Sequence, residues 1–249
     1  VALITGASGW LGGAMAAALA EAGASVVVAS RDATRGAKVA CELPTVTGSR
    51  HHSVVLDQLD EGSIQCGFDA AVESAGKVDI LINNGHASNG HDLVDVDADQ
   101  FNRVLANASG SFLLARHLHD HVVRRKVAGS VVNIGSMYGQ VGSYPDAYRD
   151  LCNASPVSYH ALKGGIIHMT RHLAVYWASD RVRVNCLSPG PFPAPTAPRG
   201  LARRLQEKSP MGRMGRPHEL KGALLLLASD AGSYITGQNL TVDGGWTAW

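Results

Sequence analysis

Short apolar runs rich in β-branched residues alternate with longer helix-like segments along the whole chain. The predicted strands span residues 1–5, 25–30, 52–56, 78–83, 129–135, 182–187 and 239–242. The predicted helices span residues 11–22, 33–42, 60–75, 97–107, 109–126, 156–179, 200–207 and 217–229. This alternation favours a parallel sheet with helices on both faces, because each connection between parallel strands must cross over the sheet. No linker or repeat interrupts the pattern, so residues 1–249 are expected to form one α/β domain with a doubly wound sheet.

Residues 1–30 are the clearest unit of this pattern. A strand at 1–5 is followed by Gly6, Gly9 and Gly12, then by an alanine-rich helix and a second buried strand. Glycines permit a tight turn and a close approach to phosphate, while the helix start offers free N–H groups and a positive dipole end. A glycine turn between a strand and a helix of a β-α-β unit therefore indicates dinucleotide binding.

Several polar or turn-forming residues stand where predicted strands end. They are Asp57 after the third strand, Asn83 and Asn84 at the fourth, Ser136 after the fifth, and Pro189 and Gly190 after the sixth. Ligands of open parallel sheets bind beyond the carboxyl ends of the strands, where the strand order reverses. We therefore expect these residues to gather around one site.

Tyr159 and Lys163 lie four residues apart in a segment with helical apolar spacing. On a helix such residues share a face, with Cβ atoms about 5–6 Å apart. A neighbouring ammonium favours the phenolate and lowers the pKa of a tyrosine from its usual value of about 10. A tyrosine tuned in this way can exchange a proton with a substrate oxygen at neutral pH. Such pairs also occur on ordinary helix surfaces, so the rest of the chain must support this interpretation.

The combined motifs resemble those of the short-chain dehydrogenase/reductase family, in its single-domain branch. The resemblance covers the whole length and rests on TGASGWLG at 5–12, LD at 56–57, NNG at 83–85, Asn107, NIGS at 133–136, YHALK at 159–163, SPG at 188–190 and VDGG at 242–245. It implies a Rossmann-type sheet of about seven strands with helices on both faces. It also implies an enzyme that moves hydride between NAD(P)(H) and an alcohol or carbonyl compound, chemistry that belongs to the cofactor.

The resemblance also assigns roles to individual residues. Tyr159 would be the acid–base residue, Lys163 would lower its pKa and hold the nicotinamide ribose, and Ser136 would bond the substrate oxygen. Asn107 would position a water that links Lys163 to solvent, and Asp57 would bond the adenine amino group. The expected cofactor-binding residues are Gly6, Ser8, Gly9, Trp10, Leu11, Gly12, Ser30, Arg31, Asp57, Gln58, Asn84, Gly85, Tyr159, Lys163, Pro189 and Gly190.

Two residues depart from the family pattern. Trp10 stands where many single-domain members have a glycine, which gives the G-x-x-G-x-x-G spacing of the extended branch. Its ring is expected either to cover the adenosine or to turn outwards. His86 replaces a glycine in NNGH. A replaced glycine often reports backbone freedom only, so we expect His86 to point to solvent rather than to contact the cofactor.

The residues at the end of the second predicted strand indicate the choice of cofactor, because an acidic residue there would bind the ribose 2′-hydroxyl of NAD. Ser30 takes that place here, and Arg31 follows with a fork of donors suited to a 2′-phosphate. Asp32 comes next and offsets part of that charge, and Arg31 could instead stack on the adenine of either cofactor. NADP(H) is therefore the expected cofactor, with NAD(H) as the alternative.

The substrate is expected to be a sugar, a polyol or a sugar acid, as in the family members that the chain resembles. Tyr159 lies 23 positions after Ser136, where the family more often has about a dozen, so residues 137–158 include an insertion of loop size. Its tyrosines and charged side chains suit a polyhydroxylated ligand. Prolines stiffen the segment at 188–199, which in the family lies over the substrate, and Arg199, Arg203 and Arg204 could hold a carboxylate or remain solvated.

Composition excludes other functions. The net charge of +1 gives no electrostatic case for nucleic acid, and no apolar run approaches the roughly 18 residues of a membrane helix. No secretory leader is visible, and the four cysteines show no paired spacing, so reduced thiols and a cytoplasmic location are expected. His117, His119 and His121 belong to no recognised ligand set, so no metal is predicted.

Family resemblance further predicts a small-molecule substrate and a homo-oligomer, namely a tetramer packed through the helices at 109–126 and 156–179. Two alternatives to a dehydrogenase remain. The glycine spacing suggests a sugar-nucleotide epimerase or dehydratase of the extended branch. A non-catalytic dinucleotide sensor would not need Ser136, Tyr159 and Lys163.

Overall fold

The computed structural model describes residues 1–46, 48–88, 90 and 93–248. Its centre is one parallel sheet of seven strands in the order β3-β2-β1-β4-β5-β6-β7. The strands are β1 (Ala2–Thr5), β2 (Val26–Ser30), β3 (His52–Val55), β4 (Ile80–Asn83), β5 (Gly129–Ile134), β6 (Val182–Pro189) and β7 (Asn239–Val242). The order reverses between β1 and β4, whose carboxyl ends flank the crevice expected to bind a ligand.

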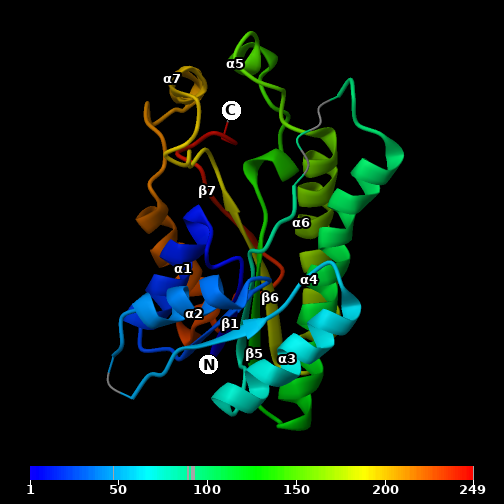
Figure 1. Ribbon diagram of the computed structural model, residues 1–249, viewed down its shortest axis with the longest axis vertical. Helices are drawn as coiled ribbons and strands as arrows, with labels where there is room; N and C mark the ends of the chain where they lie inside the picture. The colour runs from blue at the N-terminus through cyan, green and yellow to red at the C-terminus, as the bar shows by residue number, and fades with distance from the viewer. Residues whose placement is uncertain (47, 89, 91–92, 249) are drawn as a thin grey trace.

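Helices cover both faces of the sheet (Figure 1). They are α1 (Trp10–Glu21), α2 (Ala33–Glu42), α3 (Glu61–Ala75), α4 (Ala98–Arg124), α5 (Pro145–Tyr148), α6 (Val157–Trp177), α7 (Arg199–Lys208) and α8 (Lys221–Ala228). Three 3₁₀ turns are η1 (Met137–Gly139), η2 (Pro217–Leu220) and η3 (Asp230–Gly232). Figure 1 shows α5 and α7 together beyond the carboxyl ends of the strands, above the sheet.

Successive side chains of each strand point to opposite faces of the sheet, so the core consists of two layers. Ala2 and Ile4 of β1 pack in one cluster with residues of α1, α2 and α8. Leu3, which points to the other face, packs with residues of α3, α4 and α6. Because both faces of each central strand are buried, these strands are almost continuously apolar, as parallel sheets require.

One helix replaces two predicted ones. We expected a break between helices at 97–107 and 109–126, but α4 is continuous from Ala98 to Arg124. The polar, glycine-containing stretch around Gly110 resembles a turn, yet a Cβ on Gly110 would lie 2.0 Å from the Gln58 carbonyl oxygen. The glycine therefore permits a close approach of the chain at Gln58, and it does not end the helix.

Two further predictions at the helix level need correction. The predicted helix at 217–229 consists of the 3₁₀ turn η2 followed by the shorter α8. Residues 137–155 of the insertion, for which no element was predicted, contain η1 and α5. Pro145 begins α5, as proline often does at the first position of a helix.

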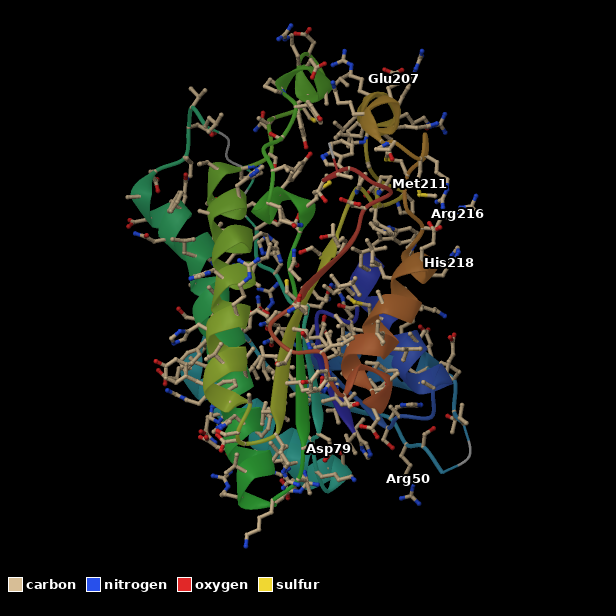
Figure 2. The ribbon with its side chains drawn as sticks, turned by 180° about the vertical axis from the view of Figure 1, so that it is seen from behind. Arg50, Asp79, Glu207, Met211, Arg216 and His218 are labelled. Carbon is tan, nitrogen blue, oxygen red and sulfur yellow. The ribbon has the colours of Figure 1, made fainter. Side chains whose placement is uncertain are left out.

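Charged side chains stabilise the end of the sheet where the strands begin, far from the crevice. Asp79, just before β4, accepts a hydrogen bond from Arg125 Nη1 at 3.0 Å, and Lys77 Nζ lies 3.5 Å from its carboxylate. Figure 2 shows Asp79 at the opposite end of the molecule from Glu207 on α7. This end therefore has a structural role.

The three clustered histidines serve in packing. His117 stacks on Phe68, His119 bonds the carboxylates of Asp120 and Asp180, and His121 accepts from the Val78 amide. In the described part of the chain no group of three or more His, Cys, Asp or Glu side chains is placed to hold a metal ion. All four cysteines are free, and no described helix is long and apolar enough to cross a bilayer.

Candidate active site

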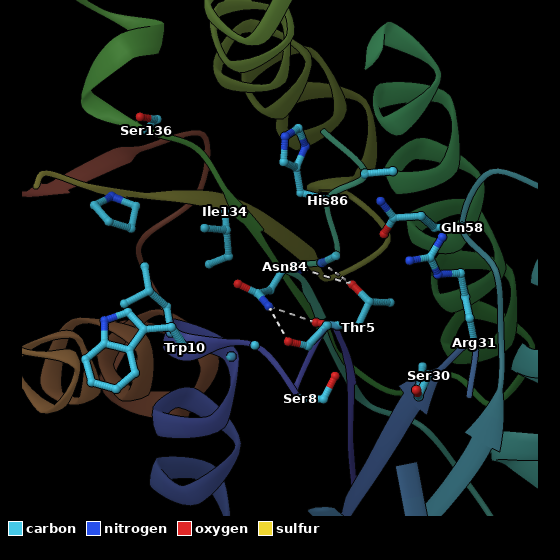
Figure 3. Close-up of a pocket in the computed structure, with 18 of the residues that line it drawn as sticks. Thr5, Ser8, Trp10, Ser30, Arg31, Gln58, Asn84, His86, Ile134 and Ser136 are labelled. Carbon is cyan, nitrogen blue, oxygen red and sulfur yellow. Dashed lines mark hydrogen bonds between the residues drawn. The ribbon is translucent and has the colours of Figure 1, made fainter. Parts of the chain in front are cut away.

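The glycine turn forms a cradle at the start of α1. Gly6 has a φ of +67°, which favours glycine, and a Cβ on Gly12 would lie 2.1 Å from the Gly6 carbonyl oxygen. Asn84 Nδ2 donates to the carbonyls of Thr5 and Gly6 at 3.0 Å each, which fixes the turn against the end of β4 (Figure 3). Gly9 caps α1 without a side chain, so the first amides of the helix stay available to a phosphate.

A cavity of about 880 Å³ opens above this cradle, within the range of cofactor sites. Every residue expected to bind the cofactor lines it. Further residues that line the cavity were not predicted to bind the cofactor: Thr5, Ala29, Asp32, Arg35, Leu56, His86, Ala87, Ile134, Gly135 and Phe192. Several of them stand in the quoted motifs or at strand ends, whereas Arg35, Ala87 and Phe192 carry no local signal. The cradle and the cavity fit a dinucleotide.

One end of the cavity is formed by the residues that follow β2. Arg31 is exposed and lines the cavity beside Gln58, as Figure 3 shows. The Asp32 carboxylate accepts from the Arg35 amide at 3.0 Å and so caps α2. Ser30 Oγ accepts from the Asp32 amide at 3.2 Å. The end of β2 therefore presents a short neutral residue and an arginine fork to the cavity.

Trp10 lies away from that end. Its ring is 45% exposed and lines the cavity on the side opposite Arg31 and Ser30 (Figure 3). Of the two expected positions, a cover over the adenosine does not match this placement, because the residues that would bind the adenosine ribose stand across the cavity.

The other end of the cavity brings together Ser136, Tyr159 and Lys163. Ser136 follows β5 and begins η1, where its hydroxyl accepts from the Tyr138 amide at 3.1 Å. Tyr159 and Lys163 come from the first two turns of α6. The predicted catalytic trio therefore forms one group, although 23 residues separate the serine from the tyrosine.

The pKa of Tyr159 differs from our expectation. We expected Lys163 to lower it, but burial raises the pKa of Tyr159 above its usual value, and the Ser136 hydroxyl only partly offsets this effect. Lys163 Nζ lies 5.6 Å from the centre of the Tyr159 ring and donates to the Ile134 carbonyl at 2.6 Å. The two residues share a helix face, but the long lysine side chain reaches the end of β5 instead of the phenol oxygen.

Lys163 is itself strongly perturbed. Its side chain is buried, and burial lowers the pKa of Lys163 to about 8. A buried ammonium needs hydrogen-bond partners, and Ile134 supplies only one. The remaining donors can serve ribose hydroxyls, because Lys163 lines the cavity.

Asn107 lies beneath the site and does not line either cavity described here. Its Oδ1 accepts from the Ala87 amide at 2.9 Å and from Gln58 Nε2 at 2.5 Å. Its Nδ2 donates to the carbonyls of Ala87 and Val104 at 3.0 and 2.8 Å. All four positions are occupied by protein groups, so the side chain clamps the loop after β4.

His86, on that clamped loop, is exposed as expected, and its ring also lines the cavity (Figure 3). Its ring meets the Tyr159 ring edge-on, with centroids 5.2 Å apart. Partial desolvation of the ring, with the nearby Lys163 charge, lowers the pKa of His86 to about 4. His86 is therefore a neutral group beside Tyr159.

A second cavity of about 430 Å³ adjoins the first at Ser136, Tyr159, His86, Gly190 and Phe192, which line both. Pro191 and Pro193 form part of its wall, as expected for the segment after β6. Among the described lining residues there is no Asp, Glu, Lys or Arg. The three arginines considered for carboxylate binding do not line this cavity. Two of them have other partners: Arg204 donates to the carbonyls of Asp146 and Arg149, and Arg203 pairs with Glu207.

Comparison with known proteins decides the family. A family model described as enoyl-(acyl carrier protein) reductase matches residues 6–247. This chain belongs to the short-chain dehydrogenase/reductase family. Cis-4-hydroxycyclohexanecarboxylate dehydrogenase of Sinomonas cyclohexanicum is 34% identical over 100% of this chain and 96% of its own length. Galactitol 2-dehydrogenase (L-tagatose-forming) of Cereibacter sphaeroides is 35% identical, with 100% and 95% covered.

Solved structures agree with the fold and the cofactor class. A short-chain type dehydrogenase/reductase from Mycobacterium marinum has a TM-score of 0.88 and 32% identity, covering 100% of this chain and 95% of its own. A gluconate 5-dehydrogenase from Burkholderia cenocepacia, in complex with NADP and tartrate, has a TM-score of 0.85 and 29% identity, with 100% and 95% covered. A short-chain dehydrogenase from Leptospira borgpetersenii with bound NAD+ has a TM-score of 0.86 and 31% identity, with 99% and 92% covered.

These similarities confirm the predicted Rossmann-type sheet and identify an oxidoreductase that acts on CH–OH groups with a nicotinamide dinucleotide. The two alternatives, an epimerase or dehydratase and a dinucleotide sensor, find no support among these relatives.

Proposed function

We propose that this enzyme interconverts an uncharged secondary alcohol and its ketone, on a polyol, sugar or cyclic alcohol, with NADP(H) as the preferred cofactor. The observation that carries the proposal is the second cavity, which is lined by neutral side chains and opens onto Ser136 and Tyr159. A buried carboxylate needs a partner charge or several donors, and this wall supplies no cation among its described residues. Sugar acids, which were expected alongside sugars and polyols, fit it less well.

The relatives support this class of substrate. Galactitol 2-dehydrogenase, NADP-dependent mannitol dehydrogenase and sorbose reductase act on polyols or sugars by their names, at 35, 34 and 33% identity to this chain. The relative from Sinomonas takes a hydroxylated cyclohexane ring that also carries a carboxylate. The shared chemistry is a secondary hydroxyl group on a carbon chain or ring, and the neutral cavity selects its uncharged forms.

When bound, the nicotinamide would supply or accept the hydride, and the protein's task is to hold and move the proton. Tyr159 donates its proton to the oxygen of the ketone in reduction and takes it back in oxidation. Ser136 donates a hydrogen bond to the same oxygen as charge develops on it. Because burial raises the pKa of Tyr159, the phenol holds its proton at neutral pH, which is the form that protonates a ketone oxygen.

Preference for NADP(H) rests on Ser30 and Arg31. Ser30 leaves room for a 2′-phosphate. Arg31 follows it in the chain, and its exposed side chain lines the cavity. The Asp32 carboxylate, which could oppose a phosphate, is engaged in capping α2. Steady-state kinetics with both cofactors test this preference, and a higher kcat/KM with NAD(H) would contradict it.

We also propose a homotetramer in the cytoplasm. Large apolar side chains are exposed on the outer helices, with Val175 and Tyr176 of α6 at 77 and 67% and Val123 of α4 at 39%. Exposed apolar groups on adjacent helices suit burial in a subunit contact. Three exposed free cysteines, Cys41, Cys66 and Cys152, suit a reducing compartment, and fractionation of the source cells tests this.

The central experiment is a substrate screen combined with Tyr159→Phe. Uncharged ring alcohols, polyols and sugars are compared with their carboxylates at fixed NADP+. We expect turnover of uncharged alcohols and a loss of at least about 100-fold in kcat for Tyr159→Phe, with cofactor binding retained in a fluorescence titration. A preference for carboxylates would reject the proposed substrate class, and full activity of the variant would reject the role of Tyr159.

A further inference from the structure

Two tyrosines without a role in hydride transfer meet in the wall of the second cavity. Tyr138 belongs to η1 and Tyr148 ends α5, in the insertion that follows Ser136. Their hydroxyl oxygens lie 2.7 Å apart and share a hydrogen bond. Both side chains line the cavity and are only 9% exposed.

The pair has hydrogen-bonding capacity to spare. Two phenol hydroxyls carry two protons, and one hydrogen bond uses one of them. No other hydrogen bond reaches either hydroxyl from the described residues. Burial raises the pKa of Tyr138 and of Tyr148, so both stay neutral and can donate throughout the physiological range. A buried hydroxyl group normally has its donor satisfied, so the free proton calls for a partner in the cavity.

A third hydroxyl in the same wall is also without a partner. Ser158 is fully buried, lines the cavity, and its Oγ makes no hydrogen bond to any described residue. Ser158 directly precedes Tyr159 on α6, but its hydroxyl is closed off from the open cavity. The phenol pair therefore supplies the unused donor that a ligand in the cavity can reach.

The phenol pair is held rigidly. The Tyr138 ring stacks on His160, with centroids 4.7 Å apart and planes 22° from parallel, and His160 Nε2 lies 3.1 Å from Ser155 Oγ. Tyr148 packs in a small apolar cluster that includes Leu205 of α7 and Trp246. Preorganised donors discriminate between ligands better than mobile ones, because less ordering is required on binding.

The pair is also close to the catalytic group. The backbone amide of Tyr138 donates to Ser136 Oγ, and Tyr159 packs against the apolar cluster that contains Tyr138 and Tyr148. A substrate whose reacting oxygen lies between Ser136 and Tyr159 can therefore place another oxygen near the two phenols.

From this geometry we infer that Tyr138 and Tyr148 form a subsite for a second oxygen of the substrate. The preferred substrates are then diols, polyols or hydroxy ketones, and the insertion determines this specificity. The inference rests on the proposed alcohol dehydrogenase function and narrows its substrate class.

The test compares matched substrates in the purified enzyme with NADP+. Cyclohexanol is compared with the 1,2-, 1,3- and 1,4-cyclohexanediols, and 2-butanol with 2,3-butanediol. For the best diol we expect a kcat/KM at least about 10-fold above its mono-alcohol, the effect of about one hydrogen bond. Tyr148→Phe and Tyr138→Phe should each reduce this ratio at least about 3-fold.

Tyr144→Phe is the matched control. Tyr144 lies in the same insertion, but its ring packs against Trp246, with centroids 5.5 Å apart, and it does not line the cavity. Removal of its hydroxyl should leave the diol ratio within about 2-fold, the usual range for a group that makes no ligand contact.

Two results would overturn the inference. One is a wild-type diol ratio near one for every pair. The other is an equal loss of activity on diols and mono-alcohols in the phenylalanine variants, which would show that the phenols only hold the insertion in place. Failure of the proposed function looks different, because the wild-type enzyme would then oxidise none of these alcohols.

Discussion

Lys163 is a buried charged residue, and the free-energy cost of burying its charge can be measured. Burial lowers the pKa of Lys163 from 10.5 to about 8, which corresponds to a cost of roughly 3 kcal/mol when the group is charged in the folded protein. Below about pH 8 this cost is fully present. Between about pH 8 and 10.5 the folded protein binds fewer protons than the unfolded chain, so the cost is relieved as pH rises.

We therefore predict that Lys163→Met abolishes most activity but stabilises the fold at pH 7, by roughly 1–3 kcal/mol. Urea unfolding at several pH values gives the free energy of unfolding of both proteins. The advantage of the variant should shrink between about pH 8 and 10.5, where the wild-type lysine loses its proton. A constant difference across that interval would show that the ammonium is not desolvated as the structure indicates.

At the scale of elements, α5 and α7 are linked above the substrate cavity. Arg204 of α7 donates to the carbonyls of Asp146 and Arg149, at the end of α5, and Lys208 Nζ lies 2.8 Å from the Asp146 carboxylate. Lys208 also lies 4.4 Å from the centre of the Tyr144 ring. These contacts join the insertion to the segment after β6, although about 55 residues separate Arg149 from Arg204. Since α5 carries Tyr148, the link positions part of the substrate site.

Arg204→Ala should loosen that link. We predict that KM for the substrate rises about 3- to 10-fold while kcat changes less than about 2-fold, because the proposed catalytic residues stand on α6 and at the start of η1. Arg203→Ala is the control, since Arg203 is exposed and pairs only with Glu207 among the described residues. The same rise in KM in both variants would point to a general effect of surface charge.

The whole molecule leaves apolar surface on α4 and α6, which the proposed tetramer would bury. Light scattering after size exclusion should give about four times the chain mass of 26.1 kDa. Tyr176→Arg should shift the protein to smaller species, because a charge replaces a side chain that is 67% exposed in the single chain.

Met211→Arg provides the comparison, since Met211 is also exposed but lies near the C-terminal segment, away from these helices (Figure 2). A wild-type protein that elutes as a monomer would contradict the proposed assembly, and equal dissociation in both variants would place the contact elsewhere.

Short-range sequence patterns determined the fold of this enzyme and the location of its site. The strand runs, the glycines at 6, 9 and 12 and the spacing of Tyr159 and Lys163 are short-range patterns, and backbone geometry converts them directly into a turn, a helix face and strand ends. Because parallel strands end at one edge, even residues far apart such as Ser136 and Gly190 could be placed at one site.

Tertiary structure decided the electrostatics and the surroundings of each site residue. The raised pKa of Tyr159, the engaged side chain of Asn107 and the position of His86 depend on what packs around each group. The Tyr138–Tyr148 pair forms only because α5 folds back over η1 within the insertion. Burial and long-range contacts have no period in the sequence, so the chain predicts which residues come to the site but not the environment that each one finds there.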